Sequence, residues 1–105
     1  MKMKACLTSE LMPGKMMKVD LLDHTVLVAN VDGTFYAMDG ICSHGFADLV
    51  GGQLYGAIVE CPRHFARYDI RTGKVVSGPV GAEGIARDLR SYPVQVEEGC
   101  VNVDI

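Results

Sequence analysis

Short stretches of alternating apolar and polar residues recur along this chain, and glycine, aspartate or proline separates one stretch from the next. Residues 15–22 alternate weakly, and residues 24–31 form a run rich in β-branched side chains. Asp32-Gly33 then supplies the residues that a tight turn requires, and residues 34–38 resume the apolar pattern. Two such runs joined by an Asp-Gly pair predict a β-hairpin.

The rest of the chain is divided in the same way. Further strand-like segments are residues 57–61, 67–76, 92–96 and 100–105, with turns at Thr72-Gly73 and Glu97-Glu98-Gly99. Only residues 81–89 hint at a helix, and the glycines there weaken that pattern. A length of 105 residues suits one domain, so we expect a single all-β domain over residues 1–105, built as a small sandwich or barrel.

Charge and hydropathy exclude several classes of function. Ten Lys and Arg against thirteen Asp and Glu give a net charge of −3, and no basic tract exists, so we expect no nucleic-acid binding. The longest apolar stretch, residues 25–31, is far too short to cross a bilayer. The N-terminal residues before Pro13-Gly14 lack the apolar region of a signal peptide. We therefore expect a cytoplasmic protein without a membrane anchor, in which clustered cysteines bind metal more often than they form disulfides.

Two of the three histidines lie beside two of the four cysteines. Cys42 and His44 form one pair, Cys61 and His64 form the other, and sixteen residues separate His44 from Cys61. Each pair follows a predicted strand. The glycine-rich segment between the pairs can fold back and bring the two loops face to face, so the sequence predicts one site with two thiolate and two imidazole ligands.

Three kinds of metal centre compete for such a ligand set. A single zinc ion is held by Cys2His2 sites, which usually pair Cys with Cys and His with His at close spacing. A blue-copper site requires two His, one Cys and an axial Met, and the six methionines do not follow that pattern. A Rieske cluster needs two Cys on one iron and two His on the other. Two loops that each supply one Cys and one His suit the two-iron cluster best.

The spacing C-x-H followed by C-x-x-H resembles the motif of the Rieske iron–sulfur proteins, matched here by "CSH" and "CPRH". The resemblance extends over residues 39–105. It implies a small Rieske-type β-sandwich whose cluster-binding subdomain contains two loops within about residues 40–80. It also implies one [2Fe-2S] cluster as the cofactor, ligated by Cys42, His44, Cys61 and His64.

The bulky Phe65 after the second histidine and the short chain resemble the ferredoxins of bacterial aromatic-ring dioxygenase systems, which serve aromatic hydrocarbon catabolism. The resemblance implies a one-electron carrier, without catalytic residues of its own. It would take its electron from an NAD(P)H-dependent flavoprotein ferredoxin reductase and pass it to a terminal oxygenase, acting as a monomer. The mononuclear iron site of an oxygenase needs further His and carboxylate ligands, and His24 is the only other histidine in the sequence.

The chain departs from the respiratory Rieske pattern at three positions. Ala47 and Arg63 stand where respiratory members carry a disulfide, and Ala66 stands where they place a serine hydroxyl near a cluster sulfur. Fewer hydrogen bonds to sulfur imply a potential low in the Rieske range, which begins at roughly −150 mV. Tyr68 opposes this trend, because the resemblance implies that its hydroxyl can donate a hydrogen bond to a cluster ligand and raise the potential.

Several residues around the ligands receive further interpretations. Phe46, Phe65 and the loop at Pro79 are expected to form an apolar rim over the histidine edges, where the electron would leave. Arg63 and Arg67 flank the second pair and are candidates for steering an acidic partner. We expect His24 at the surface, and Cys6 and Cys100 as buried small hydrophobes.

Two other functions stay open on the sequence. The chain could be a small electron-transfer subunit of another redox enzyme, such as a nitrite reductase or an alkane or sterol hydroxylase system. It could also be a zinc-stapled binding module without a redox role.

Overall fold

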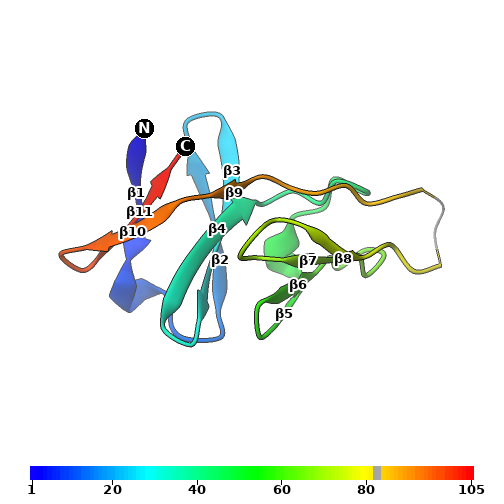
Figure 1. Ribbon diagram of the computed structural model, residues 1–105, viewed down its shortest axis with the longest axis horizontal. Coiled ribbons are helices and arrows are strands. Elements are labelled where there is room, and N and C mark those ends of the chain that lie inside the picture. The colour runs from blue at the N-terminus through cyan, green and yellow to red at the C-terminus, as the bar shows by residue number, and fades with distance from the viewer. Residues whose placement is uncertain (82–83) are drawn as a thin grey trace.

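Antiparallel pairing joins the strands of the computed structural model, which describes residues 1–81 and 84–105 (Figure 1). The strands in these ranges are β1 (Lys2–Leu7), β2 (Met16–Leu21), β3 (His24–Val31), β4 (Thr34–Asp39), β5 (Gln53–Tyr55), β6 (Ile58–Glu60), β7 (Arg67–Asp69), β8 (Val75–Ser77), β9 (Ser91–Tyr92), β10 (Val94–Glu97) and β11 (Cys100–Asp104). Two short 3-10 turns accompany them, η1 (Thr8–Glu10) and η2 (Leu49–Gly51). The sheets have the orders β1-β11-β10, β2-β3-β4-β9 and β5-β6-β7-β8.

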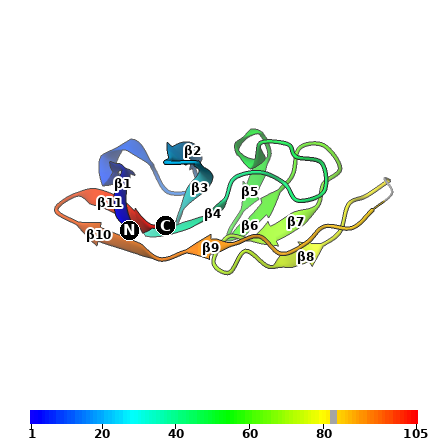
Figure 2. The same ribbon diagram turned by 90° about the horizontal axis from the view of Figure 1, so that it is seen from above.

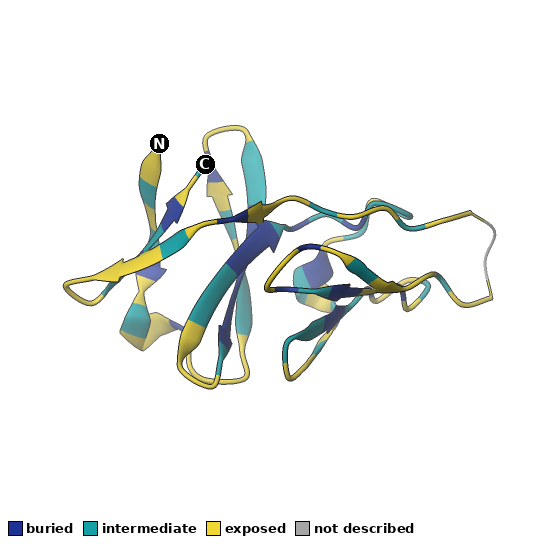
Figure 3. Ribbon diagram, viewed as in Figure 1, coloured by how far each residue is buried: buried dark blue, intermediate teal, exposed yellow. Residues whose placement is uncertain are grey.

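Strand β3 separates two hydrophobic cores. Its side chains alternate between its two faces, so Val26 and Val28 enter the first core while Leu27 and Ala29 enter the second. A strand buried on both faces needs a nearly continuous apolar sequence, which explains the run that predicted it. Figure 3 shows this burial in the middle of the molecule, in contrast to the mostly exposed strand β10 and the turn that follows it.

The two cores belong to different parts of the fold. The first core joins the sheet of the chain termini to β2, β3 and β4, and consists of Cys6, Leu11, Leu21, Val26, Val28, Ala37, Tyr92, Val101 and Val103. The second core lies between β3, β4 and the sheet β5-β6-β7-β8, and consists of Leu27, Ala29, Met38, Cys42, Leu49, Val59, Cys61, Ala66, Tyr68 and Ile70. Burial of each large apolar side chain contributes about 1.5–3 kcal/mol. Two of the predicted ligands, Cys42 and Cys61, are therefore part of the second core.

Three connecting segments gather at the end of the molecule far from both termini (Figures 1 and 2). Residues 42–47 follow β4, residues 61–66 join β6 to β7, and residues 78–81 and 84–90 lie between β8 and β9. The β6–β7 pairing sets Val59 opposite Tyr68, and both side chains are fully buried beneath these loops. The molecule measures 45 × 27 × 19 Å, and the loops occupy one end of its long axis.

The predicted all-β fold and both hairpins are confirmed. Strands β1 and β5 were not predicted, although β1 alternates with period two. Pro93 splits the predicted strand 92–96, because the chain changes sheets there: Tyr92 pairs with β4 and Val94 with β11. Proline lacks the amide hydrogen that a continuous ladder needs, so it suits this change.

The weak helical pattern of residues 81–89 does not give a helix in its described part, residues 84–89, while residues 82–83 lie outside the described residues. Residues 84–90 run extended along the molecule because their backbone groups bond to distant partners. The Leu89 amide donates to the Gly73 carbonyl at 2.7 Å, and the Asp39 amide donates to the Arg90 carbonyl at 2.9 Å. Gly73 has φ +78°, and a Cβ there would lie 2.1 Å from the Leu89 carbonyl oxygen, so the close approach requires glycine.

Candidate metal centre

The two candidate loops have the same pattern of backbone hydrogen bonds. They read "CSHGFA" over residues 42–47 and "CPRHFA" over residues 61–66. In the first loop the Phe46 amide donates to the Cys42 carbonyl, and the Cys42 amide donates to the Ala47 carbonyl, both at 2.9 Å. The second loop repeats both bonds, at 3.2 Å and 2.8 Å respectively. Each turn therefore presents a cysteine at its first position and closes at its sixth.

Phenylalanine occupies the fifth position of both loops in the left-handed conformation. Phe46 has φ +55° and Phe65 has φ +63°. This region costs a residue with a Cβ about 1–2 kcal/mol, and it is unusual for a bulky side chain. Such a conformation persists where surrounding bonds fix it, and strained residues concentrate at functional sites. The same strained residue at the same position shows that the two loops have one conformation.

Each cysteine sulfur is surrounded by amide donors from its own loop. In both turns these amides belong to the third and fourth residues, namely His44 and Gly45 for Cys42, and Arg63 and His64 for Cys61. Successive amides that converge on one atom stabilise negative charge there, as metal-bound thiolates require. Both sulfurs are buried and they interact with each other.

Burial and hydrogen bonding act in opposite directions on the two thiols. Burial raises the pKa of Cys42, but the Tyr68 hydroxyl and the loop amides outweigh it, so the net pKa is below the ordinary value. Burial also raises the pKa of Cys61, and there it prevails over the amides, so the net pKa is above the ordinary value. Two contacts distinguish the environments: the Tyr68 hydroxyl lowers the pKa of Cys42 alone, and the interaction between the two thiols lowers the pKa of Cys42 and raises that of Cys61.

The Tyr68 hydroxyl oxygen lies 3.3 Å from the Cys42 sulfur, within the second core. Burial, with the Cys42 thiol next, raises the pKa of Tyr68 to about 12. The phenol therefore keeps its proton at every ordinary pH and can donate it to a thiolate. The contact of the Tyr68 hydroxyl with a predicted ligand agrees with the expectation drawn from the sequence.

The two histidine rings lie against each other. The ring centroids of His44 and His64 are 5.1 Å apart at an interplanar angle of 76°. The Nδ1 atom of His64 is buried and has no hydrogen-bond partner among the described residues. A buried polar atom without a partner is rare and needs an explanation, and a metal bond supplies one. Two amide-cradled sulfurs and a buried imidazole nitrogen fit a [2Fe-2S] cluster of the Rieske type.

A third segment closes over the two histidine loops. The Val80 amide donates to the His64 carbonyl at 2.7 Å. Gly84 has φ +100°, and a Cβ there would lie 3.2 Å from both Cδ2 and Nε2 of His44. Residues 80 and 84 therefore contact one histidine loop each, in agreement with the covering role expected for the segment around Pro79.

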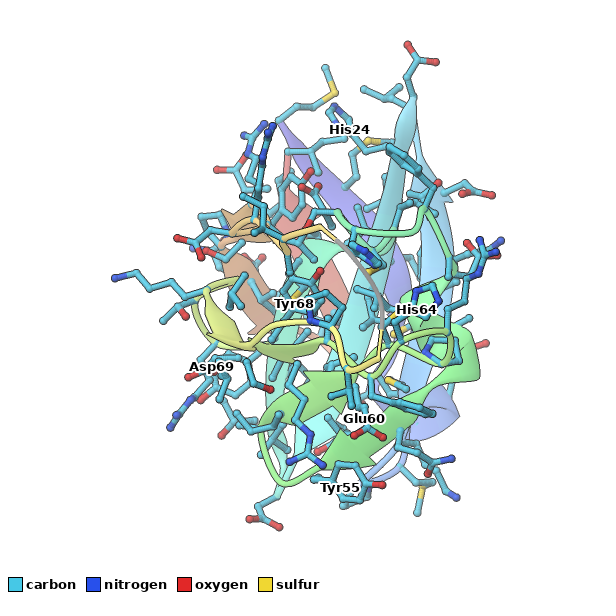
Figure 4. All side chains as sticks on the ribbon, turned by 90° about the vertical axis from the view of Figure 1, so that its right-hand side faces the viewer. His24, Tyr55, Glu60, His64, Tyr68 and Asp69 are labelled. Carbon is cyan, nitrogen blue, oxygen red and sulfur yellow. The ribbon has the colours of Figure 1, made fainter. Side chains whose placement is uncertain are left out.

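The two arginines near the second pair have different surroundings. The Arg63 guanidinium donates from Nη1 to the Gly45 carbonyl at 3.0 Å, and so it ties the two loops together where respiratory relatives are expected to have a disulfide. Arg67 pairs with Glu60 at 2.9 Å and lies 5.4 Å over the Tyr55 ring, which stands apart from His64 in Figure 4. Steering of a partner by either arginine stays a prediction.

The remaining cysteines and histidine lie outside this site. Cys6 is buried in the first core, and Cys100 is half-buried on the neighbouring strand β11. Burial raises the pKa of Cys6. His24 begins β3, half-buried, with its ring 6.1 Å from the Tyr92 ring, and it lies apart from His64 (Figure 4). Among the described residues, no three His, Cys, Asp or Glu side chains converge as a single-ion site.

One residue of the site was overlooked in the sequence. Ser43 stands between the first cysteine and histidine, and its hydroxyl contacts both Tyr68 and the backbone of Arg87. Its position inside the motif was visible, but Arg87 is 44 residues away, so no local pattern points to the contact.

Comparison with known proteins agrees with this geometry. The model of the Rieske [2Fe-2S] domain family matches residues 1–93. The ferredoxin component of the p-cumate 2,3-dioxygenase system of Pseudomonas putida is 42% identical over 102 residues, covering 95% of this chain and 82% of that protein. The solved Sphingomonas yanoikuyae B1 ferredoxin has a TM-score of 0.86 at 32% identity, covering 100% and 99% of the two chains.

A further solved structure is the complex of reduced oxygenase and oxidized ferredoxin in carbazole 1,9a-dioxygenase. A chain in it is similar with a TM-score of 0.85 at 33% identity, over 97% of this chain and 91% of that one. In the part of the chain that the structure describes, no helix has the length and apolar character needed to cross a membrane. This chain belongs to the Rieske [2Fe-2S] domain family and, within it, to the electron-carrying ferredoxin components of aromatic dioxygenase systems.

Proposed function

We propose that this chain holds one [2Fe-2S] cluster between its two loops and carries single electrons from an NAD(P)H-dependent flavoprotein reductase to a terminal ring-hydroxylating oxygenase. Cys42 and Cys61 would hold one iron of this cluster, and His44 and His64 would hold the other. The observation that supports this assignment best is the buried, unpartnered Nδ1 of His64 beside the amide-cradled sulfurs.

The residues around the site have complementary tasks in this proposal. When bound, the cluster supplies a one-electron acceptor whose two neutral imidazoles make it easier to reduce than an all-cysteine cluster. The loop amides and the Tyr68 hydroxyl stabilise the negative charge on sulfur. The second core excludes water from the sulfur side, while the half-buried histidine rings leave a short path to the surface.

The surface around the histidines suits a transient protein partner. Four exposed apolar side chains come from the three segments at this end: Phe46 is 80% exposed, Phe65 49%, Val80 63% and Ile85 71%. Exposed apolar side chains gathered at one end of a protein are typical of an interaction site, and redox partners meet over small interfaces. The solved complex of an oxygenase with a similar ferredoxin supports an oxygenase as the partner.

Several finer properties belong to the same proposal. Residues 1–105 would form one Rieske domain that acts as a monomer in the cytoplasm. The absence of a hydroxyl at Ala66 favours a potential low in the Rieske range, and the Tyr68 contact with Cys42 raises it within that range.

Low-temperature EPR of the dithionite-reduced protein tests the cofactor and its ligands together. We expect a Rieske-type signal with about two irons and two acid-labile sulfides per chain. Colourless protein that contains zinc and gives no signal would refute the proposal.

The variant H64C tests the histidine ligand directly. It should retain iron but have a lower potential, because a thiolate adds negative charge that a neutral imidazole does not. The variant H24C is the matched control, since His24 lies outside the site, and its potential should equal that of the wild type. Equal potentials for H64C and the wild type would contradict imidazole ligation.

A further inference from the structure

The Ser43 hydroxyl is the centre of a small hydrogen-bond network at the first ligand loop. The Arg87 amide donates to Ser43 Oγ at 2.8 Å, and Ser43 Oγ donates to the Arg87 carbonyl at 2.8 Å. The same Oγ lies 3.0 Å from the Tyr68 hydroxyl oxygen, which lies 3.3 Å from the Cys42 sulfur. Ser43 thus connects the segment of residues 78–90 to the sulfur through one phenol.

The hydroxyl hydrogens in this network are too few for its contacts. Ser43 and Tyr68 each carry one hydroxyl hydrogen. Three contacts compete for the two: Ser43 with the Arg87 carbonyl, Ser43 with Tyr68, and Tyr68 with Cys42. A free thiol at Cys42 supplies a third hydrogen, but a metal-bound thiolate has none. With the sulfur bound to iron, one of the three contacts must give up its hydrogen.

The charge on the sulfur decides which contact gives up its hydrogen. A thiolate accepts more strongly than a neutral hydroxyl, so Tyr68 directs its hydrogen to Cys42. The Ser43 hydrogen then turns to the Tyr68 oxygen, because two hydroxyl oxygens 3.0 Å apart repel without a hydrogen between them. Arg87 is exposed, so water can replace the lost donor at its carbonyl.

We propose that Ser43 is a positioning residue that tunes the cluster, because it donates to the Tyr68 hydroxyl and so strengthens the donation from Tyr68 to the Cys42 sulfur. The Arg87 amide keeps the Ser43 oxygen in place for this role. The inference rests on the proposed function, since it requires Cys42 to be a metal-bound thiolate. Successive hydrogen bonds polarise one another, so a relay that ends on the sulfur stabilises the reduced, more negative state.

The reduction potential of the S43A variant tests this role. At a fixed applied potential, loss of the relay should lower the ratio of reduced to oxidised protein about twofold. This estimate assumes that cooperativity adds a modest fraction to the free energy of a charge-assisted hydrogen bond. This ratio corresponds to about 18 mV for a one-electron couple. Voltammetry of the purified holoprotein, with EPR to show that the cluster is intact, measures it.

The Y68F background separates positioning from a general structural effect. If Ser43 acts through Tyr68, S43A should lower the potential of the wild type but leave that of Y68F unchanged. An equal decrease in both backgrounds, no decrease in either, or an increase in the wild type would overturn the proposal.

An isosteric pair covers the case in which S43A loses its cluster. S43T and S43V have the same shape and differ in one hydroxyl, and S43T should have the higher potential. Equal potentials for the pair would refute the relay. A wild-type protein without a Rieske EPR signal would instead refute the proposed function itself.

Discussion

Gly84 lies against the His44 ring, and its replacement by alanine tests whether residues 78–90 hold that imidazole in place. The added Cβ would lie 3.2 Å from two ring atoms, a contact that forces either the ring or the segment to move. The variant G81A is a matched control from the same segment. Gly81 also has a positive φ, at +68° against +100° for Gly84, but a Cβ there meets nothing within 4 Å.

Both variants lose stability through backbone strain, and G84A loses more through a side-chain contact. A side chain at positive φ costs about 1–2 kcal/mol, and both variants incur this backbone strain. G84A adds the contact with His44, and overpacking of this kind costs typically about 1–3 kcal/mol more. Each additional kcal/mol lowers the Tm of a domain of this size by roughly 4–8 °C. We therefore expect G84A to melt at least about 4 °C below G81A.

Thermal melts followed by circular dichroism and by cluster absorbance measure this difference. In G84A the cluster absorbance should also be lost earlier, relative to the backbone signal, than in G81A, because the added contact falls on a proposed ligand. Identical melts for G84A and G81A would refute the contact. A large loss of stability in G81A would show instead that backbone strain dominates the segment.

Four further predictions concern single side chains around the site. Y68F should lower the reduction potential by about 30–60 mV while leaving the fold intact. The reason is that the lost hydrogen bond to a charged sulfur contributes about 1 kcal/mol to the free-energy difference between the redox states. An unchanged potential would argue against donation by Tyr68. R63Q should speed thermal loss of the cluster through the broken Arg63–Gly45 bond, with R87Q as an exposed control that behaves like the wild type. F65G should keep or raise the unfolding midpoint in urea, since glycine tolerates the φ of +63° at this position. It should slow electron transfer to the oxygenase in a stopped-flow assay, because Phe65 is exposed near the histidines. Equal transfer rates would show that Phe65 is not part of the docking face. The Arg71 guanidinium holds the pKa of Asp69 below its ordinary value, so this carboxylate stabilises the fold above about pH 4, and the stabilisation is lost as pH falls through the lowered pKa. D69N should therefore reduce the decrease of Tm at acidic pH. An unaltered decrease would contradict this linkage.

Sequence patterns were informative where structure is local. The alternation in residues 15–38 and the Asp32-Gly33 turn predicted β2, β3 and β4, since a strand and its tight turn depend on neighbouring residues. The ligand motif was likewise readable, because each loop holds its Cys and His within four residues and the order and spacing of the pairs are specific.

Local patterns failed where distant segments meet. Strand β1 is stabilised by pairing with β11 at the other end of the chain, so its own short alternation was a weak signal. Residues 84–90 carry a faint helical pattern, but bonds to Gly73 and Asp39 hold them extended. The left-handed turns at Phe46 and Phe65 oppose the preference of those residues, and only the surrounding loop bonds stabilise them.

The amino-acid sequence by itself determined the all-β class, the principal hairpins and the pair of Cys-His loops, because each depends on residues close together in the chain. Only the tertiary structure decided that two equivalent turns set their sulfurs side by side, that Tyr68 reaches the first sulfur and Ser43 reaches Tyr68, and that Gly84 lies against His44. These contacts join residues 19 to 44 positions apart, and packing of the whole chain around β3 brings them together.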